Sequence, residues 1–199
     1  MDSNQELVDY LVRSGRIEDP DVERAFRDVD RARFIPEGRK QEAYRDHAVP
    51  IGHDVTVSAP HMVAVNTEML EVEPGNTVLE IGSGSGYQAA VLAELAEKVV
   101  GVERVRDLVE RSRRALAGYD NVEIVHGNGL EAVQEEFDRI LFSCAIDSME
   151  PAKKYLREEG VMVAPVKKDG GQVMQKYRDG ETETGYRVRF VDYVDEPVD

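Results

Sequence analysis

A glycine-rich turn in the segment VLEIGSGSGYQAA (78–90) constrains the possible folds of this chain more than any other feature. The residues around it predict a short buried strand over 77–81 and a helix over 87–96. Glycines between a strand and a helix let the backbone turn sharply and approach a ligand, because no Cβ is in the way. The segment therefore predicts a βαβ unit with a ligand-binding loop.

The alternation of strands and helices continues downstream. Further strands are predicted at 99–103, 122–127 and 139–145, and helices at 107–116 and, more weakly, 152–156. This order is typical of a parallel sheet with helices on both faces. The final apolar segments, VMVAPV, QVMQKY and YRVRFVDY, are separated only by KKDGG and DGETETG, which favour antiparallel hairpins. We therefore expect an α/β fold whose mostly parallel sheet ends antiparallel.

The beginning of the chain has a different character. A capping box starts at Ser3, Asp19-Pro20 opens a second helix, and a third helix is predicted from Ala59 to Glu71. The intervening YRDHAVPIGHDVTVS is expected to be irregular or extended. We expect one domain, 1–199, made of a helical preface, 1–75, and a cofactor-binding core, 76–199.

Composition excludes several classes of function. Forty acidic residues against 25 basic ones give a net charge of −15, which argues against a nucleic-acid partner. Arginines outnumber lysines, and such acidic surfaces are typical of an acidic proteome that works at high salt, although an ordinary cytosolic protein is the alternative. No signal peptide or membrane span is apparent, so we expect a cytoplasmic protein without a membrane partner.

The single cysteine, Cys144, excludes an internal disulfide and a multi-cysteine zinc site. It lies in the apolar segment RILFSCA, where a small buried residue is favoured over a nucleophile. No metal site is therefore expected.

Two acidic residues suggest what the glycine loop binds. Glu80 ends the strand before the glycines, where its carboxylate can support the loop or bind a cationic amino-acid ligand. Glu103 ends the next strand, where a carboxylate can hold both hydroxyls of a ribose, although a solvated strand end is also possible. NAD and S-adenosyl-L-methionine both fit, and the G-x-G-x-G spacing, the HGNG segment and the antiparallel finish favour the second.

The segment HDVTVSAPHMVA (53–64) raises a separate question, because Ser58 precedes a predicted helix start. A helix cap is the simplest interpretation of this serine. A hydroxyl and free backbone N–H groups at a helix start are also suitable donors to an anion.

Taken together, these segments resemble the protein-L-isoaspartate O-methyltransferase family. The resemblance covers about residues 6–194 and includes RSGRIEDPDVERAFRDVDRARFIPE, AYRDHAVPIG, VTVSAPHMVA, the glycine loop, NVEIVHGNG, FDRILFSCA, EGVMVAPV and YRVRFV. It implies a Rossmann-like, S-adenosylmethionine-dependent methyltransferase fold with seven strands and a reversed last strand. It also implies methyl transfer to the α-carboxylate of L-isoaspartyl residues in damaged proteins, with isoaspartyl peptides as partners. We further expect a monomer.

The resemblance assigns roles to individual residues. Ser58 is the implied catalytic residue at the substrate carboxylate, within a substrate-binding segment of Val57, Ser58, Ala59 and His61. The implied cofactor-binding residues are Glu80, Gly82, Ser83, Gly84, Gly86, Glu103, Asn128 and Gly129.

Some positions depart from the family pattern. Asp54 and Val55 stand where glycine and glutamine are usual, Asn128 replaces an aspartate, and AIDSMEP replaces a small, proline-rich segment. These differences leave open a methyltransferase with another carboxylate or small-molecule substrate. The sequence is also compatible with a non-catalytic cofactor-binding protein and, more distantly, with a dehydrogenase.

Overall fold

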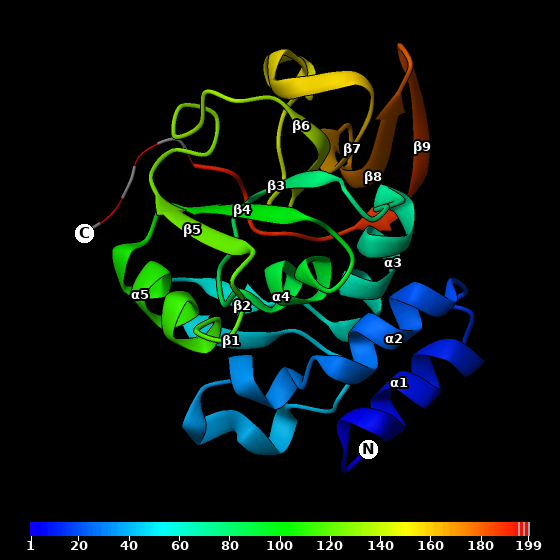
Figure 1. The fold of residues 1–199 in the computed structure, drawn as a ribbon, viewed down its shortest axis with the longest axis vertical. Helices are drawn as coiled ribbons and strands as arrows, with labels where there is room; N and C mark the ends of the chain where they lie inside the picture. The colour runs from blue at the N-terminus through cyan, green and yellow to red at the C-terminus, as the bar shows by residue number, and fades with distance from the viewer. Residues whose placement is uncertain (195, 197, 199) are drawn as a thin grey trace.

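The computed structural model describes residues 1–194, 196 and 198, and its centre is a seven-stranded sheet (Figure 1). The strands are β3 (Thr77–Ile81), β4 (Lys98–Glu103), β5 (Val122–His126), β6 (Phe137–Phe142), β7 (Leu156–Lys168), β8 (Gly171–Arg178) and β9 (Glu181–Val188). Their order is β5-β4-β3-β6-β7-β8-β9; the first five are parallel, β8 is antiparallel to β7, and β9 is antiparallel to β8. The α/β fold with an antiparallel finish is therefore confirmed.

The α-helices pack on one face of this sheet. They are α1 (Asn4–Arg13), α2 (Pro20–Asp28), α3 (Pro60–Leu70), α4 (Tyr87–Ala93) and α5 (Arg106–Ala115). Successive strand residues alternate between two apolar clusters: Val99 joins the cluster that includes these helices, whereas Val100 joins the cluster on the other face.

The second face differs from the expected layer of helices. A right-handed connection from β5 back to β6 must cross this face, because β6 lies on the opposite side of β3 from β4 and β5. That connection, 127–136, is irregular, and the following connection contains the 3₁₀ helix η3 (Glu150–Tyr155). We expected helices on both faces of the sheet. In the part of the chain that the structure describes, all α-helices lie on one face, so this expectation was wrong.

The N-terminal preface confirms its predicted helix starts. Ser3 Oγ accepts the N–H of Glu6 at 3.2 Å, and Asp19 accepts the N–H of Asp21 at 2.7 Å. The 3₁₀ helices η1 (Arg31–Phe34) and η2 (Glu37–Glu42) follow. Buried side chains of α1 and α2 lie in the same apolar cluster as α4, so the preface and the α/β core share one interior.

Of two further predicted segments, one is confirmed and one differs. The part expected to be irregular or extended is extended in a hairpin of β1 (Val49–Gly52) and β2 (Val55–Val57). The segment DGETETG, predicted as a turn, forms a turn only at its first two residues and then starts β9. Of the described helices, none has the length and apolar character needed to cross a membrane.

Candidate active site

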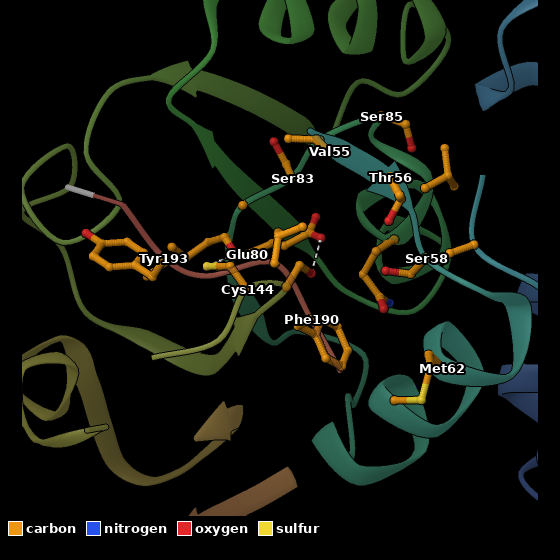
Figure 2. Close-up of a pocket in the computed structure, with 18 of the residues that line it drawn as sticks. Val55, Thr56, Ser58, Met62, Glu80, Ser83, Ser85, Cys144, Phe190 and Tyr193 are labelled. Atoms are coloured by element: carbon orange, nitrogen blue, oxygen red, sulfur yellow. Dashed lines mark hydrogen bonds between the residues drawn. The ribbon is translucent and has the colours of Figure 1, made fainter. Parts of the chain in front are cut away.

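A cleft of about 1180 Å³ opens at the carboxyl ends of β3, β4 and β6. It lies where the strand order reverses, between β3 and β6, which is the usual ligand position in open α/β sheets. The β1–β2 hairpin, the start of α3, the glycine loop and the C-terminal segment 187–194 complete its walls. Figure 2 shows Ser58 and Met62 on one side, Tyr193 on the other, and Glu80 between them.

Most of the predicted site residues line this cleft. They are Val57, Ser58, Ala59, His61, Glu80, Gly82, Ser83, Gly84, Glu103 and Gly129. Two others do not. Gly86 supports the loop from behind, with a φ of 84°, and a Cβ there would lie 2.8 Å from Leu116 Cδ1. Asn128 Oδ1 accepts hydrogen bonds from the N–H of Leu130 and the hydroxyl of Tyr193.

Glu103 is fixed by two backbone donors. One carboxylate oxygen accepts the N–H of Gly84 and the other the N–H of Val105, both at 2.9 Å. The side chain is buried, so the interpretation as a solvated strand end is wrong. Glu103 therefore shapes the glycine loop as well as lining the cleft.

Glu80 is a buried carboxyl with one unused oxygen. Its Oε1 accepts the hydroxyl of Ser143 at 2.7 Å, whereas its Oε2 has no partner among the described residues. Burial raises the pKa of Glu80 to about 8, with Glu103 also acting to raise it and the Ser143 hydrogen bond opposing the increase. A cation bound at Oε2 would compensate for the lost hydration.

The start of α3 corrects the helix-cap interpretation of Ser58. Ala59 is the N-cap residue, and no side chain caps the helix from that position. Instead, Asp46 Oδ1 accepts both the backbone N–H of His61 at 2.9 Å and a hydrogen bond from its ring Nδ1 at 2.8 Å. Within the described chain, the Ser58 hydroxyl has no hydrogen-bond partner, so it can donate to a ligand.

The backbone N–H groups in the first turn of α3 are already used. Pro60 has no N–H, His61 donates to Asp46, and both Met62 and Val63 donate to the carbonyl of Ala59. An anion at this turn therefore depends on the Ser58 hydroxyl rather than on a row of free N–H groups.

Arg31 connects the preface to this turn, and the sequence did not single it out. Its fully buried guanidinium donates to the carbonyls of Ala43 at 2.8 Å, His47 at 3.0 Å and Ser58 at 3.0 Å, with a longer bond of 3.3 Å to Arg45. Burial lowers the pKa of Arg31, but a guanidinium stays protonated in proteins. A buried cation thus fixes the backbone position of Ser58.

The hairpin tip covers the glycine loop. His53 and Asp54 both have left-handed backbone angles, with φ of 53° and 57°, and Asp54 is exposed beside the cleft. His53 Nε2 lies 3.2 Å from a carboxylate oxygen of Asp107, and this contact is the main cause of the lowered pKa of Asp107. The tip is thereby attached to the first turn of α5.

Sequence reasoning also missed the C-terminal wall of the cleft. Phe190 and Tyr193 line it, although YRVRFVDY by itself predicts only a strand.

Cys144 also lines the cleft, and its side chain is buried, as predicted. Burial strongly raises the pKa of the Cys144 thiol, which does not suit a nucleophile. Among the residues that the structure describes, no cluster of acidic, histidine or cysteine side chains could hold a metal ion.

Comparisons with known proteins agree with this geometry. The sequence model of protein-L-isoaspartate(D-aspartate) O-methyltransferase matches residues 2–197. A protein-L-isoaspartate O-methyltransferase from Aliivibrio fischeri is 38% identical over 202 aligned positions, covering 98% of this chain and 97% of that protein. One from Methanoculleus marisnigri is 41% identical, covering 90% and 85%.

A crystal structure of such a methyltransferase from Plasmodium falciparum, in complex with S-adenosyl-L-homocysteine, has a TM-score of 0.87. It is 29% identical, and the similarity covers 98% of this chain and 99% of that one. The similarity thus extends over the preface, the sheet and the cleft together. The chain belongs to the protein-L-isoaspartate(D-aspartate) O-methyltransferase family.

Proposed function

We propose that this protein transfers the methyl group of S-adenosyl-L-methionine to the α-carboxylate of L-isoaspartyl residues in damaged proteins. One observation carries the proposal: the hydroxyl of Ser58, which has no hydrogen-bond partner among the described residues, borders the same cleft as the glycine loop, Glu80 and Glu103. The curated relatives and the family match support the same reaction.

The residues present fit the cofactor. Glu80 offers an unpaired buried oxygen to its ammonium group, and Glu103 offers its carboxylate to the ribose hydroxyls. Gly82 has a φ of 85°, a left-handed conformation that side chains rarely adopt, so this wall of the cleft consists of backbone at that position. Gly129 lines the part of the cleft proposed for the adenine, with Asn128 behind it. The bound cofactor supplies an electrophilic methyl group on a sulfonium.

The chain's own residues then have a positioning role. A substrate α-carboxylate has a pKa of about 3.5 and is ionised at neutral pH, so no general base is needed. Correct alignment alone can supply roughly 7–11 kcal/mol of the barrier reduction. Ser58 donates one hydrogen bond to the carboxylate, which orients this nucleophile without stabilising it strongly. Arg31 keeps Ser58 in place, and the Asp46 bond holds the ring of His61.

A peptide methylation assay tests the proposal. The protein is incubated at high salt with labelled S-adenosyl-L-methionine and matched peptides that contain isoaspartate or aspartate. We expect base-labile label on the isoaspartyl peptide alone. Cofactor binding without transfer to either peptide would contradict the proposed reaction and favour a non-catalytic binding protein.

Asp54 is the observation that favours a second candidate, a methyltransferase with another carboxylate substrate. Its exposed side chain lines the cleft and has no partner among the described residues, so it adds a negative charge near the reacting carboxylate. The same assay with small dicarboxylates separates this candidate from the first.

Replacing Ser58 by alanine should lower kcat/KM for the isoaspartyl peptide roughly 10- to 100-fold, because one hydrogen bond to a charged group is lost. The Kd for S-adenosyl-L-homocysteine, measured by calorimetry, should change less than about twofold. Ser3→Ala is the control: it removes a true helix cap, costs about 1 kcal/mol of stability and leaves turnover unchanged. Equal losses of turnover and cofactor affinity in Ser58→Ala would contradict the assigned role.

Cofactor affinity should depend on the protonation of Glu80. With a raised pKa of about 8, the free carboxyl holds a proton at about pH 6–7, and a bound ammonium group favours the ionised form. Binding therefore releases one proton, so affinity for S-adenosyl-L-homocysteine should rise about tenfold from pH 6 to pH 7 and level off near pH 8. Glu80→Gln should bind more weakly and without this rise. A similar pH slope in both proteins would show that another group titrates.

We further propose that residues 1–75 and 76–199 work as one domain. The apolar cluster that α1 and α2 share with α4 supports this proposal. The monomeric state and the cytoplasmic location remain predictions, as does the absence of a membrane or nucleic-acid partner. Sedimentation at several protein concentrations tests the first.

A further inference from the structure

Gln88, in the first turn of α4, has an amide whose orientation is fixed by its neighbours. The side chain lines the cleft and is 6% exposed. Its Nε2 lies 3.0 Å from Thr67 Oγ1, and the Thr67 hydroxyl donates to the carbonyl of Val63 at 2.8 Å. Because that hydroxyl has already committed its proton, it can only accept from Gln88. The amide nitrogen of Gln88 therefore points to Thr67, and its Oε1 points away from Thr67.

The Oε1 atom of Gln88 is a buried acceptor without a donor among the described residues. Gln172, another glutamine of the cleft wall, is different: its Nε2 donates to the carbonyl of Phe190 at 3.0 Å and its Oε1 accepts the N–H of Phe190 at 2.6 Å. Unpaired buried acceptors are unfavourable, so they are rare and call for a partner. At a cleft wall, a ligand N–H can be that partner.

The chemistry of the ligands restricts which donor this is. The reactive carboxylate only accepts hydrogen bonds, so it cannot pair with Oε1. The cofactor's ammonium group matches the ionisable Glu80, and its ribose hydroxyls match Glu103. The adenine amino group is assigned to the Gly129 and Asn128 side of the cleft, with Tyr193 and opposite Ser58. Among the ligand donors next to the reacting carboxylate, the backbone N–H of the isoaspartyl residue remains. In an isoaspartyl residue this N–H and the free carboxylate are attached to the same carbon, whereas in an aspartyl residue one further carbon separates them.

We propose that Gln88 Oε1 accepts the backbone N–H of the isoaspartyl residue, while Ser58 donates to its carboxylate. This inference rests on the proposed function. A donor and an acceptor held at a fixed spacing would select the isoaspartyl linkage over the aspartyl one. Gln88 is then a specificity-determining residue that contacts the substrate, with Thr67 as the positioning residue that sets its amide.

The test combines a variant with a modified peptide. An isoaspartyl peptide methylated on that backbone nitrogen lacks the proposed donor, and Gln88→Leu lacks the acceptor at similar side-chain size. We expect each change alone to raise KM about tenfold, as for one lost hydrogen bond, and both together to raise it no further than either alone. The Kd of Gln88→Leu for S-adenosyl-L-homocysteine should be unchanged.

Several outcomes would overturn the inference. Additive losses of the two changes, or an unchanged KM for the N-methylated peptide with the unaltered enzyme, exclude this hydrogen bond; the second result needs no variant. A tenfold weaker Kd for S-adenosyl-L-homocysteine in Gln88→Leu would assign the side chain to the cofactor. Gln175→Leu, the same exchange outside the cleft, should keep the full N-methyl penalty. An unaltered enzyme that methylates no isoaspartyl peptide contradicts the proposed function itself.

Discussion

Replacing Arg31 by methionine should lower the free energy of unfolding by roughly 3–5 kcal/mol. The substitution removes a buried cation that donates to four backbone carbonyls. The carbonyl of Arg45 keeps the N–H of His47, but the other three lose the donor that the described residues give them, at about 1–3 kcal/mol for each that stays dry. Relief of the desolvation of the guanidinium offsets part of this cost. Urea unfolding with an unchanged m-value measures the effect, which corresponds to a decrease in Tm of roughly 10 °C.

The same variant should lose turnover in the fraction that remains folded, because the carbonyl of Ser58 is one of the four acceptors. Arg24→Met is the matched control, since Arg24 is exposed and, among the described residues, pairs only with Asp21 on the helix surface, so its loss should cost less than about 1 kcal/mol. A stable Arg31→Met enzyme with normal kcat would show that Arg31 does not hold the backbone of Ser58 in place.

Replacing Glu103 by glutamine should weaken the binding of S-adenosyl-L-homocysteine at least about 100-fold. The two carboxylate oxygens accept the N–H groups of Gly84 and Val105, and a glutamine amide has only one oxygen. Either orientation of the amide therefore brings its NH₂ against a backbone N–H in a buried site, which costs several kcal/mol. The substitution also removes the charge proposed to bind the ribose, and calorimetry measures the combined loss.

Glu123→Gln on the adjacent strand β5 is the control, because Glu123 is exposed and the same exchange there should change neither stability nor cofactor affinity. Hydrogen exchange at the glycine loop separates the two causes of the Glu103 effect. If the Gly84 amide of Glu103→Gln stays as protected as in the unaltered protein, the carboxylate does not hold the loop.

The parallel part of the fold was predictable because its central strands, β3, β4 and β6, are buried on both faces. Such strands are continuous apolar segments, and TVLEI appears without change as β3. The strand β9 was misplaced because its first residues, ETETG, have weak strand preference. Their pairing with β8 overrides that preference, while Asp179 and Gly180, both at positive φ, form the actual turn.

The candidate site was predictable where its chemistry is local in the sequence. The glycine loop and Glu80 are contiguous, and Glu103 follows at the spacing of one βα unit. The cap of α3 was not predictable, because Asp46 reaches it through the tertiary fold and displaces the serine that local spacing favoured. Arg31 was also missed because its partners are brought together by the tertiary fold. They are backbone carbonyls, which every residue type has, so no sequence pattern marks them.

Sequence reasoning could not identify Gln88 either. A glutamine after a glycine loop is typical of an ordinary helix, and only the hydrogen bond to Thr67 shows that its oxygen is left without a donor. The role of Gln88 depends on a partner on another helix, α3, and a sequence pattern within α4 does not show such a partner.

The position of β9 at the margin of the sheet has a consequence for contacts between copies of the chain. Within the described chain, no strand pairs with its outer side, and nearly all of its residues are exposed, so another strand could add there. Glu181 and Glu183 lie on this strand together with one cation, Arg187, so a second copy added in parallel register would place glutamates opposite glutamates, which is destabilising. The acidic surplus of the chain thus also acts as a barrier to edge-to-edge aggregation, in a protein proposed to handle partly damaged partners.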